Sequence, residues 1–397
     1  MSLDFSWVSP HNKVAHSSLS LPKRIGVYDT TLRDGEQTAG VVFRPEDKIR
    51  IAEELDAVGV DRIEVGMPAI SEEDRQAIAA ITEMGLNSEL WGFSRCREDD
   101  VDRCLDLGLE HLLIEYPISP IKLSAYNFDP KTVDETIERV VAYAKSAGVY
   151  VAFMFVDGTR APMETLLSAA ASAQAGGTDE FVLPDTVGGA SPQAIHFLVD
   201  AICSRFDVPL GIHCHNEFGM ATACTLAGVI AGANWVHTTV NGLGEKSGNS
   251  DMAEVVVAAS LLYGIESSID LSRLTQLAHL VEDISGVPLS PTKAVVGRNV
   301  FRRESGSVIA QMINMPSAVE SYDPALVGQQ REIVLGKKSG KQSIIAVLKS
   351  LGIEVAPEAI ETILQDVKSL SLKNKSSINE RELLAIVEKI DTTSFVE

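Results

Sequence analysis

The chain has 397 residues, 45% of them hydrophobic, which is enough for one large domain with a buried core and a smaller part besides. Its 55 acidic residues outnumber 34 basic ones, and the net charge of -21, with no locally basic patch, argues against a nucleic-acid or membrane partner. No apolar run approaches the roughly 18 residues of a membrane span, and the N-terminus lacks the order of a signal peptide. The five cysteines include no CxxC pair, which predicts reduced thiols and a cytoplasmic location.

Eight short β-branched runs recur along the chain, with helical patterns between them. They are RIGVYD (24–29), RIEVG (62–66), ELWGF (89–93), HLLIEY (111–116), VYVAFMF (149–155), EFVLPD (180–185), PLGIHCH (209–215) and WVHTTV (235–240). In the helical pattern at 45–60, Pro45 suits the first turn and Gly59 the C-cap. Eight strand–helix units predict an α/β fold, a closed (β/α)8 TIM barrel, whose chemistry lies at the carboxyl ends of the strands.

The pattern changes after about residue 262, so a second, smaller part is expected. The predicted division is an N-terminal extension (1–23), a TIM-barrel catalytic domain (24–285), a linker segment with little periodicity (286–340) and a small helical subdomain (341–397). Three helices are expected in the last part, at about 341–351, 357–370 and 378–390. The sequence from Ser377 to Glu380 matches a capping box at the start of the third helix.

Two histidines, His213 and His215, lie one residue apart at the end of the seventh predicted strand. The period of two places both rings on one face and Cys214 on the other. The pair alone fits either a metal site or two hydrogen-bonding imidazoles. Asp34, in TLRDGEQT after the first strand, adds a carboxylate. A carboxylate with two neutral imidazoles suits Mn²⁺, Zn²⁺ or Mg²⁺, with positions left open for substrate.

A glycine-rich loop, NGLGEKSGN (241–249), follows the eighth predicted strand. One interpretation is a loop that needs positive φ angles. A dinucleotide fingerprint is disfavoured, because that motif follows the first strand of an open sheet. The loop ends in Asn249, whose amide oxygen could reach a metal at the rim, and its backbone amides could instead meet a phosphate.

Two polar residues fall inside predicted barrel strands. Glu64 in the second strand would be a costly buried charge without a partner, so an ion pair with a basic residue is expected. His237 in the eighth strand is expected to be an interior histidine with its hydrogen bonds satisfied.

Five long motifs occur in order along the barrel: DTTLRDGEQT (29–38), IEVGMPAISEED (63–74), LPDTVGG (183–189), HCHNEFGMA (213–221) and VNGLGEKSGN (240–249). With them the chain resembles the isopropylmalate synthase and homocitrate synthase family of TIM-barrel metalloenzymes, which is related to hydroxymethylglutaryl-CoA lyase. The resemblance implies metal-dependent condensation of an acyl-CoA, expected to be acetyl-CoA, with an α-keto acid. It also implies a homodimer.

The resemblance assigns roles to residues of these motifs. Asp34, His213 and His215 would bind the divalent metal, with Asn249 as a fourth or near ligand. Arg33 would be the cation beside the carbonyl oxygen of the keto acid, although a rim salt bridge with Asp34 is the alternative. Substrate-binding positions are expected at Gln37, Arg95 and Thr186, and Thr186 could instead only cap a helix.

The direction of the reaction is inferred from the loop after the eighth strand. GEKSGN is close to the GERxGN of the synthases, whereas the lyase branch carries a catalytic cysteine there, and no cysteine occurs between 225 and 397. Residues 323–344 also resemble the linker of the synthases. Condensation is therefore favoured, and the length leans toward homocitrate-type or citramalate-type activity. A retro-Claisen or aldol-type lyase and a catalytically silent keto-acid-binding protein are the alternatives.

Three departures from the family pattern concern proton transfer. The glutamate, histidine and tyrosine of the synthases are replaced near Val156, Val308 and Val319. General acid–base catalysis contributes about 10²- to 10⁴-fold, so other residues must take over or the reaction is altered. The candidate substitutes are Glu245, Glu304 and Tyr322.

Overall fold

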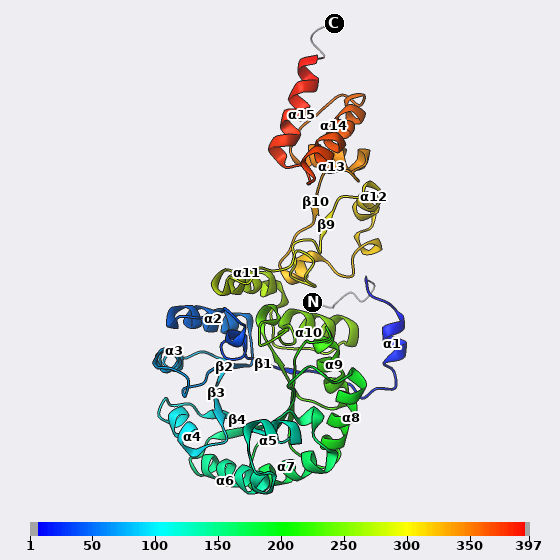
Figure 1. Cartoon of the computed structure of the whole chain (residues 1–397). Helices are drawn as coiled ribbons and strands as arrows, with labels where there is room; N and C mark the ends of the chain where they lie inside the picture. The colour runs from blue at the N-terminus through cyan, green and yellow to red at the C-terminus, as the bar shows by residue number, and fades with distance from the viewer. Residues whose placement is uncertain (1–6, 394–397) are drawn as a thin grey trace. The chain divides into compact units, whose positions relative to one another are not determined.

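The computed structural model describes residues 7–393, which form two compact units. The first unit, His11–Leu289, is a closed barrel of eight parallel strands in sequence order, with β1 paired to β8 (Figure 1). The second unit begins at Ser290 and includes the described residues before His11. The predicted TIM barrel is confirmed. Among residues 7–393, no helix combines the length and the apolar character needed to cross a membrane.

The strands coincide with the eight predicted runs. They are β1 Gly26–Asp29, β2 Arg62–Gly66, β3 Glu89–Arg95, β4 His111–Pro117, β5 Tyr150–Val156, β6 Glu180–Asp185, β7 Leu210–Cys214 and β8 Trp235–Thr238. Most of their residues are buried, because helices cover the outside of the barrel and side chains fill the inside. The helices of this unit are α1 His11–Ala15, α2 Pro45–Val58, α3 Glu72–Thr82, α4 Glu98–Leu105, α5 Pro120–Tyr126, α6 Val133–Ser146, α7 Met163–Ala175, α8 Pro192–Cys203, α9 Ala221–Ala231, α10 Met252–Ala258 and α11 Leu274–Ser285.

Helix α2 shows how the local sequence sets an element. It begins at Pro45, whose fixed φ suits the first turn, and it ends before Gly59, which has a left-handed φ of 92°. The residues that it buries, Ile51, Ala52, Leu55 and Val58, repeat with helical spacing and face the barrel. The start and the end predicted from Pro45 and Gly59 are confirmed.

The barrel interior changes from charged to apolar toward its mouth. At the N-terminal end, the buried Arg62 donates to Glu180 at 2.7 Å and lies over the ring of Trp235, 3.3 Å from its centroid. Burial raises the pKa of Glu180 to about 7, although Arg62 opposes the shift. Above this pair is an apolar layer of Tyr28, Trp91, Phe93, Leu113, Ala152, Met154, Val156 and Val182. The packed layer gives the mouth a rigid floor.

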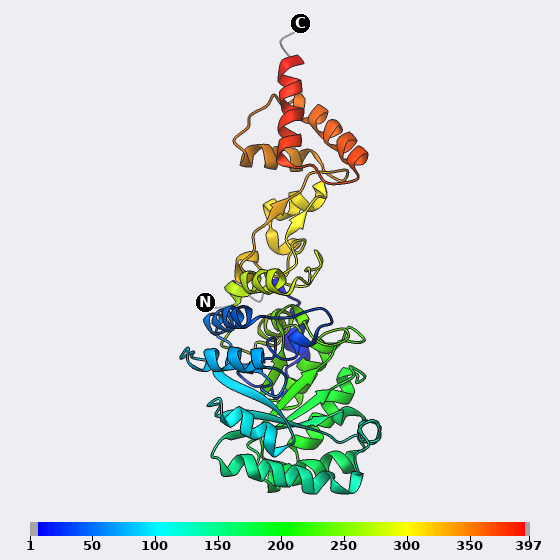
Figure 2. The same cartoon turned by 60° about the vertical axis from the view of Figure 1, so that its left-hand side comes forward.

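The second unit contains α12 Gly306–Asn314, α13 Lys341–Ser350, α14 Ala359–Asn374, α15 Glu380–Thr393 and the two short strands β9 Arg302–Arg303 and β10 Glu332–Ile333. The last three helices, drawn from orange to red in Figure 2, share a core that includes Ile344, Leu364 and Leu383. The three predicted C-terminal helices are confirmed.

One helix of this unit was not predicted, and one expectation is wrong. Helix α12 lies within the predicted linker segment, and no helix was predicted there because it is short and buries only Ile309 and Met312. The capping box is formed by Asn379 and Glu382, two residues later than predicted: the side chain of each accepts a hydrogen bond from the backbone N–H of the other, at 3.0 and 2.9 Å. The helix begins at Glu380, which makes Asn379 the N-cap.

Removal of Glu180 should destabilise the barrel more than removal of the second partner of Arg62, Glu89. In Glu180→Ala the buried guanidinium loses its buried counter-charge, and the free energy of unfolding at pH 8 should fall by about 3 kcal/mol. In Glu89→Ala, whose side chain is 45% exposed, the loss should stay below about 1 kcal/mol. Urea denaturation measures both variants, and equal losses would contradict the assignment of Glu180 as the stabilising partner.

Candidate metal centre

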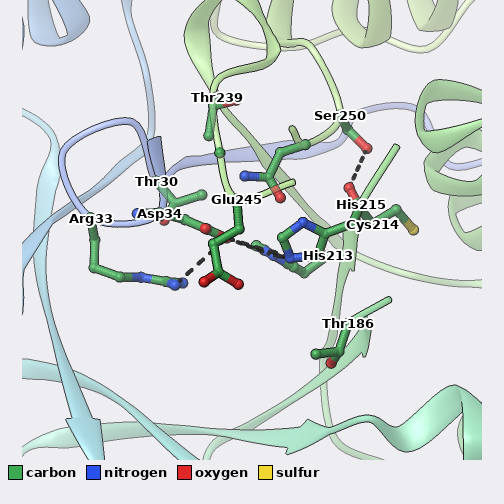
Figure 3. A network of polar contacts seen from close by, with 12 residues as sticks. Thr30, Arg33, Asp34, Thr186, His213, Cys214, His215, Thr239, Glu245 and Ser250 are labelled. Atoms are coloured by element: carbon green, nitrogen blue, oxygen red, sulfur yellow. Dashed lines mark hydrogen bonds and ion pairs between the residues drawn. The ribbon is translucent and has the colours of Figure 1, made fainter. Parts of the chain in front are cut away.

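Three buried side chains from two strand ends meet at the mouth of the barrel. Asp34 follows β1, just before the 3-10 helix Gly35–Gln37, and His213 and His215 lie at the end of β7. Asp34 Oδ2 is 3.1 Å from His213 Nε2 and 3.8 Å from His215 Nε2, and the two Nε2 atoms are 3.4 Å apart (Figure 3). Cys214 points to the other side, as the strand period predicts.

The donor atoms of this cluster fit a divalent cation. Asp34 Oδ1, His213 Nδ1 and Asn249 Oδ1 are buried and have no hydrogen-bond partner in the described part of the chain. Burial lowers the pKa of His215 to about 3, so its imidazole is neutral at pH 7. Burial would raise the pKa of Asp34, but Arg33 and His213 outweigh it and hold that pKa well below the usual range. One carboxylate and two imidazoles form a ligand set for Mn²⁺, Zn²⁺ or Mg²⁺.

The glycine-rich loop after β8 places Asn249 beside this cluster. Asn249 Nδ2 donates to the backbone oxygen of Leu243 at 3.0 Å, which leaves its amide oxygen free, and its backbone pairs with that of His215. Gly244 has a φ of 152°, and a Cβ there would lie 2.2 Å from Asn249 Nδ2. The positive-φ interpretation of the loop is confirmed. Asn249 as a metal ligand stays a prediction.

The guanidinium of Arg33 is held on several sides. Its Nε donates to Glu64 Oε2 at 2.8 Å, and its plane lies over the ring of Phe93, 4.1 Å from the centroid. Glu64 also accepts hydrogen bonds from the hydroxyls of Tyr28 and Thr30. The ion pair predicted for Glu64 is confirmed. Arg33 Nη2 is buried and has no partner in the described residues, so its N–H groups remain for a substrate oxygen.

The predicted substrate residues have different surroundings. Thr186 Oγ1 accepts the N–H of Asp157 at 2.8 Å and can still donate its own proton. Arg95 is bound to Asp100 through two hydrogen bonds, and its side chain is 47% exposed. Gln37 and Arg33 both line a cavity of about 430 Å³. The substrate roles of Gln37, Arg95 and Thr186 stay predictions.

The three candidate acid–base residues are divided between the two units of the chain. Glu245 is 58% exposed in the loop after β8, and its Oε2 lies 3.8 Å from Lys246 Nζ. Glu304 and Tyr322 belong to the second unit. There Glu304 accepts the N–H of Lys338 at 2.9 Å, and burial raises the pKa of Tyr322 to about 12. Their catalytic roles stay predictions.

The expectation for His237 is wrong in one respect. The ring lies inside the barrel, stacked on Tyr28 with 4.0 Å between centroids, as an interior position requires. However, neither ring nitrogen has a hydrogen-bond partner within residues 7–393. Burial holds the pKa of His237 well below its usual value, so the ring is neutral and packs as an aromatic group.

Two charged residues at the mouth are missing from the predicted site. Lys246 Nζ lies 3.4 Å from His215 Nδ1, in the loop that had already been singled out. Glu115 lies on β4 two residues after Leu113, which belongs to the interior layer. Its signal in the sequence is an acidic residue within an apolar strand, the same signal that drew attention to Glu64.

Fold and site together define a TIM-barrel protein with a candidate divalent-metal centre at its carboxyl-terminal mouth. The HMGL-like family model matches residues 24–281, and the model for the homocitrate synthase post-HMGL domain matches residues 295–375. A homocitrate synthase of Methanopyrus kandleri is 40% identical over 383 residues, 96% of this chain and 96% of its own length. The 2-isopropylmalate synthase of Methanocaldococcus jannaschii is 38% identical over 95% of this chain and 74% of its own.

A solved structure, the HMG-CoA lyase of Bacillus subtilis, matches 69% of this chain and 97% of its own with a TM-score of 0.62 and 20% identity. That likeness is one of fold. The chain belongs to the HMGL-like family, within its isopropylmalate synthase and homocitrate synthase group, as the motifs indicated.

Removal of a ligand should abolish tight metal binding without unfolding the barrel. Asp34→Ala and His213→Ala should each weaken Mn²⁺ binding by more than about 100-fold, because outer partners of metal ligands alone contribute about 10- to 100-fold. His279→Ala is the matched control, since this ring is 53% exposed beside Glu282. Isothermal titration calorimetry measures the affinities. Unchanged binding in both ligand variants would rule out this cluster.

Proposed function

We propose that the protein is an acyltransferase that condenses an acyl-CoA with an α-keto acid. The acyl donor is expected to be acetyl-CoA, and the products are free CoA and a 2-hydroxy dicarboxylate or tricarboxylate. The observation that carries the proposal is the placement of the unpaired Arg33 Nη2 beside the Asp34, His213 and His215 cluster. The membership in a group whose relatives are named as synthases supports the same reaction.

The chemistry follows from these residues. Asp34, His213 and His215 would hold the cation, which when bound supplies Lewis-acid polarisation of the keto acid. The hydroxyl of Thr186 is available to donate to the keto-acid carboxylate. As the carbon–carbon bond forms, an electron pair moves to the carbonyl oxygen, and the fixed guanidinium of Arg33 stabilises the resulting negative charge. Hydrolysis of the thioester then releases CoA.

The cysteines argue for condensation over cleavage. Cys214 is the cysteine between the two histidines, but it points away from them and is buried. Burial raises its pKa well above the usual value, so the thiol is a poor acid. The loop at 241–249 contains no cysteine. A thiol therefore does not reach the site from either of these segments.

Thiol release from acetyl-CoA should depend on both the cation and an α-keto acid. The assay combines the full-length protein, Mn²⁺, Mg²⁺ or Zn²⁺, and a panel of α-keto acids, with product formation followed by mass spectrometry. Asp34→Ala should abolish release, whereas His279→Ala should retain it. Pyruvate formed from a hydroxy-keto acid without CoA would select the lyase alternative. Keto-acid binding without turnover of any acyl donor would select a silent binding protein.

Replacement of Arg33 by lysine should separate charge from geometry. Lysine keeps the positive charge but lacks the planar guanidinium, which bonds Glu64 through one nitrogen and still offers a further N–H to the substrate. The value of kcat should therefore fall by about 10²- to 10³-fold. Mn²⁺ affinity should change little. Arg97→Lys, on a side chain 59% exposed, is the matched control. A kcat close to that of the wild type would show that the planar guanidinium is not used.

A further inference from the structure

Glu115 is an inward-facing carboxylate that no step above uses. It shares the interior face of β4 with Leu113, because side chains of a strand alternate. In register it lies between Arg95 on β3 and Met154 on β5. Arg95 is bonded to Asp100 and acts on Glu115 only through space, and Met154 is apolar, so neither neighbour pairs directly with the Glu115 carboxylate.

The charges that face Glu115 come from several elements. Arg33 and Asp34, after β1, Glu64 on β2 and Lys122 on α5 all act on its carboxylate through space. In the described part of the chain, its carboxylate makes no hydrogen bond and no ion pair. Burial raises the pKa of Glu115 to about 7, with Arg33 opposing the shift. Glu115 is only partly exposed, and an unpaired carboxyl that interacts through space with Arg33 and Asp34 has the environment of a tuned acid–base group.

Three other carboxylates near the mouth, Glu64, Asp157 and Asp185, are engaged, whereas the oxygens of Glu217 have no hydrogen-bond partner within residues 7–393 and one of them lies 3.6 Å from Lys246 Nζ. Glu64 binds Arg33, as described above. Asp157 binds Arg160 through two hydrogen bonds and also accepts the hydroxyl of Ser119. Asp185 accepts the backbone N–H groups of Gly189 and Ala190. A proton transfer by Glu64, Asp157 or Asp185 would first have to break such bonds.

Glu115 lies close to Val156, the position where the synthases carry a glutamate that this chain lacks. Val156 lies at the mouth end of β5, in the apolar layer and paired in register with Pro117. Glu115 is two residues before Pro117 on the neighbouring strand, so it lies on the same interior wall one step deeper. The interior wall of the barrel therefore carries a carboxylate on β4, where β5 has Val156 in place of a glutamate.

We propose that Glu115 is the general base that removes a proton from the acyl methyl group. One C–H bond of the methyl breaks, the proton moves to a carboxylate oxygen of Glu115, and the electron pair stays on the acyl fragment as an enolate. The enolate carbon then attacks the keto carbon, whose carbonyl electron pair moves to the oxygen beside Arg33. The assignment rests on the condensation proposed above.

The first test compares Glu115→Gln with Glu110→Gln in the full-length, metal-loaded protein. Glutamine keeps the size of the side chain but cannot accept the proton, so kcat should fall by about 10²- to 10⁴-fold. Mn²⁺ affinity and the KM for the keto acid should stay close to the wild-type values. Glu110 is exposed directly before β4, so the same change of charge there should leave kcat unaltered.

A second readout follows the proton alone. In D2O, deuterium from solvent should enter the methyl group of recovered acetyl-CoA with the wild type and not with Glu115→Gln. Exchange without thiol release in the wild type would support the base and overturn the condensation. Thiol release at equal rates in both proteins would overturn the base and leave the condensation standing. Neither exchange nor release in the wild type would overturn both.

The pH profile and the stability distinguish a base from a structural group. Because the base must be ionised, kcat should fall as the pH drops through the pKa of Glu115, between its ordinary 4.5 and about 7. Glu115→Asp should keep part of the activity and should shift the pH at which kcat falls on the acidic side. A neutral glutamine removes a partly buried, unpaired charge, so Glu115→Gln should melt at the same or a higher temperature at pH 8.

Two results in these measurements would overturn the assignment. The first is a loss of stability in Glu115→Gln that accounts for its loss of activity. The second is a fall of kcat on the acidic side that occurs at the same pH in Glu115→Asp as in the wild type. The aspartate variant carries the test alone if the glutamine variant does not fold.

Discussion

The ion pair between Arg33 and Glu64 is the interaction on which the site depends. Glu64 is fully buried in the second strand, and it is stable there because a guanidinium and two hydroxyls satisfy its oxygens. The same bonds fix the guanidinium over Phe93 and leave one of its nitrogens unpaired. Arg33 in turn keeps Asp34 ionised. In the proposed mechanism, one buried pair thus orients Arg33 toward the developing oxyanion and keeps the proposed metal ligand Asp34 ionised, so both groups are in place before the reaction begins.

The barrel supports this pair by a division of its interior. The charged end with Arg62 and Glu180 contributes to the fold, the aromatic and aliphatic layer excludes water, and the mouth carries the chemistry. The layer below the mouth must be rigid, because the hydrogen-bond donors at the mouth must stay within tenths of an ångström of their positions to stabilise a transition state. A strand end supplies His213 and His215 to the candidate metal centre, and the loop after β1 supplies Asp34 and Arg33.

Much of the fold could be read from the sequence because its signals are local. The eight strands and α2 follow from periodicity and from single residues such as Pro45 and Gly59. The histidines were brought to one face by the strand period, and the buried Glu64 required a partner. Helix α12 was missed because it buries only two residues. His237 and Glu115 were misjudged or missed because their partners, or the lack of them, depend on tertiary packing that no local pattern encodes.

The convergence of lone pairs in the Asp34, His213 and His215 cluster also has a consequence for the lifetime of the protein. Asp34 Oδ1, His213 Nδ1 and Asn249 Oδ1 are buried without a hydrogen-bond partner within residues 7–393, and the hydration that they lose is a cost to the folded state alone. A cation that binds only the folded chain offsets this cost, by about 2.7 kcal/mol when its concentration is 100 times Kd. At the proposed metal centre, metal supply would therefore set how much folded protein a cell keeps, because the unfolded fraction is the one open to proteolysis.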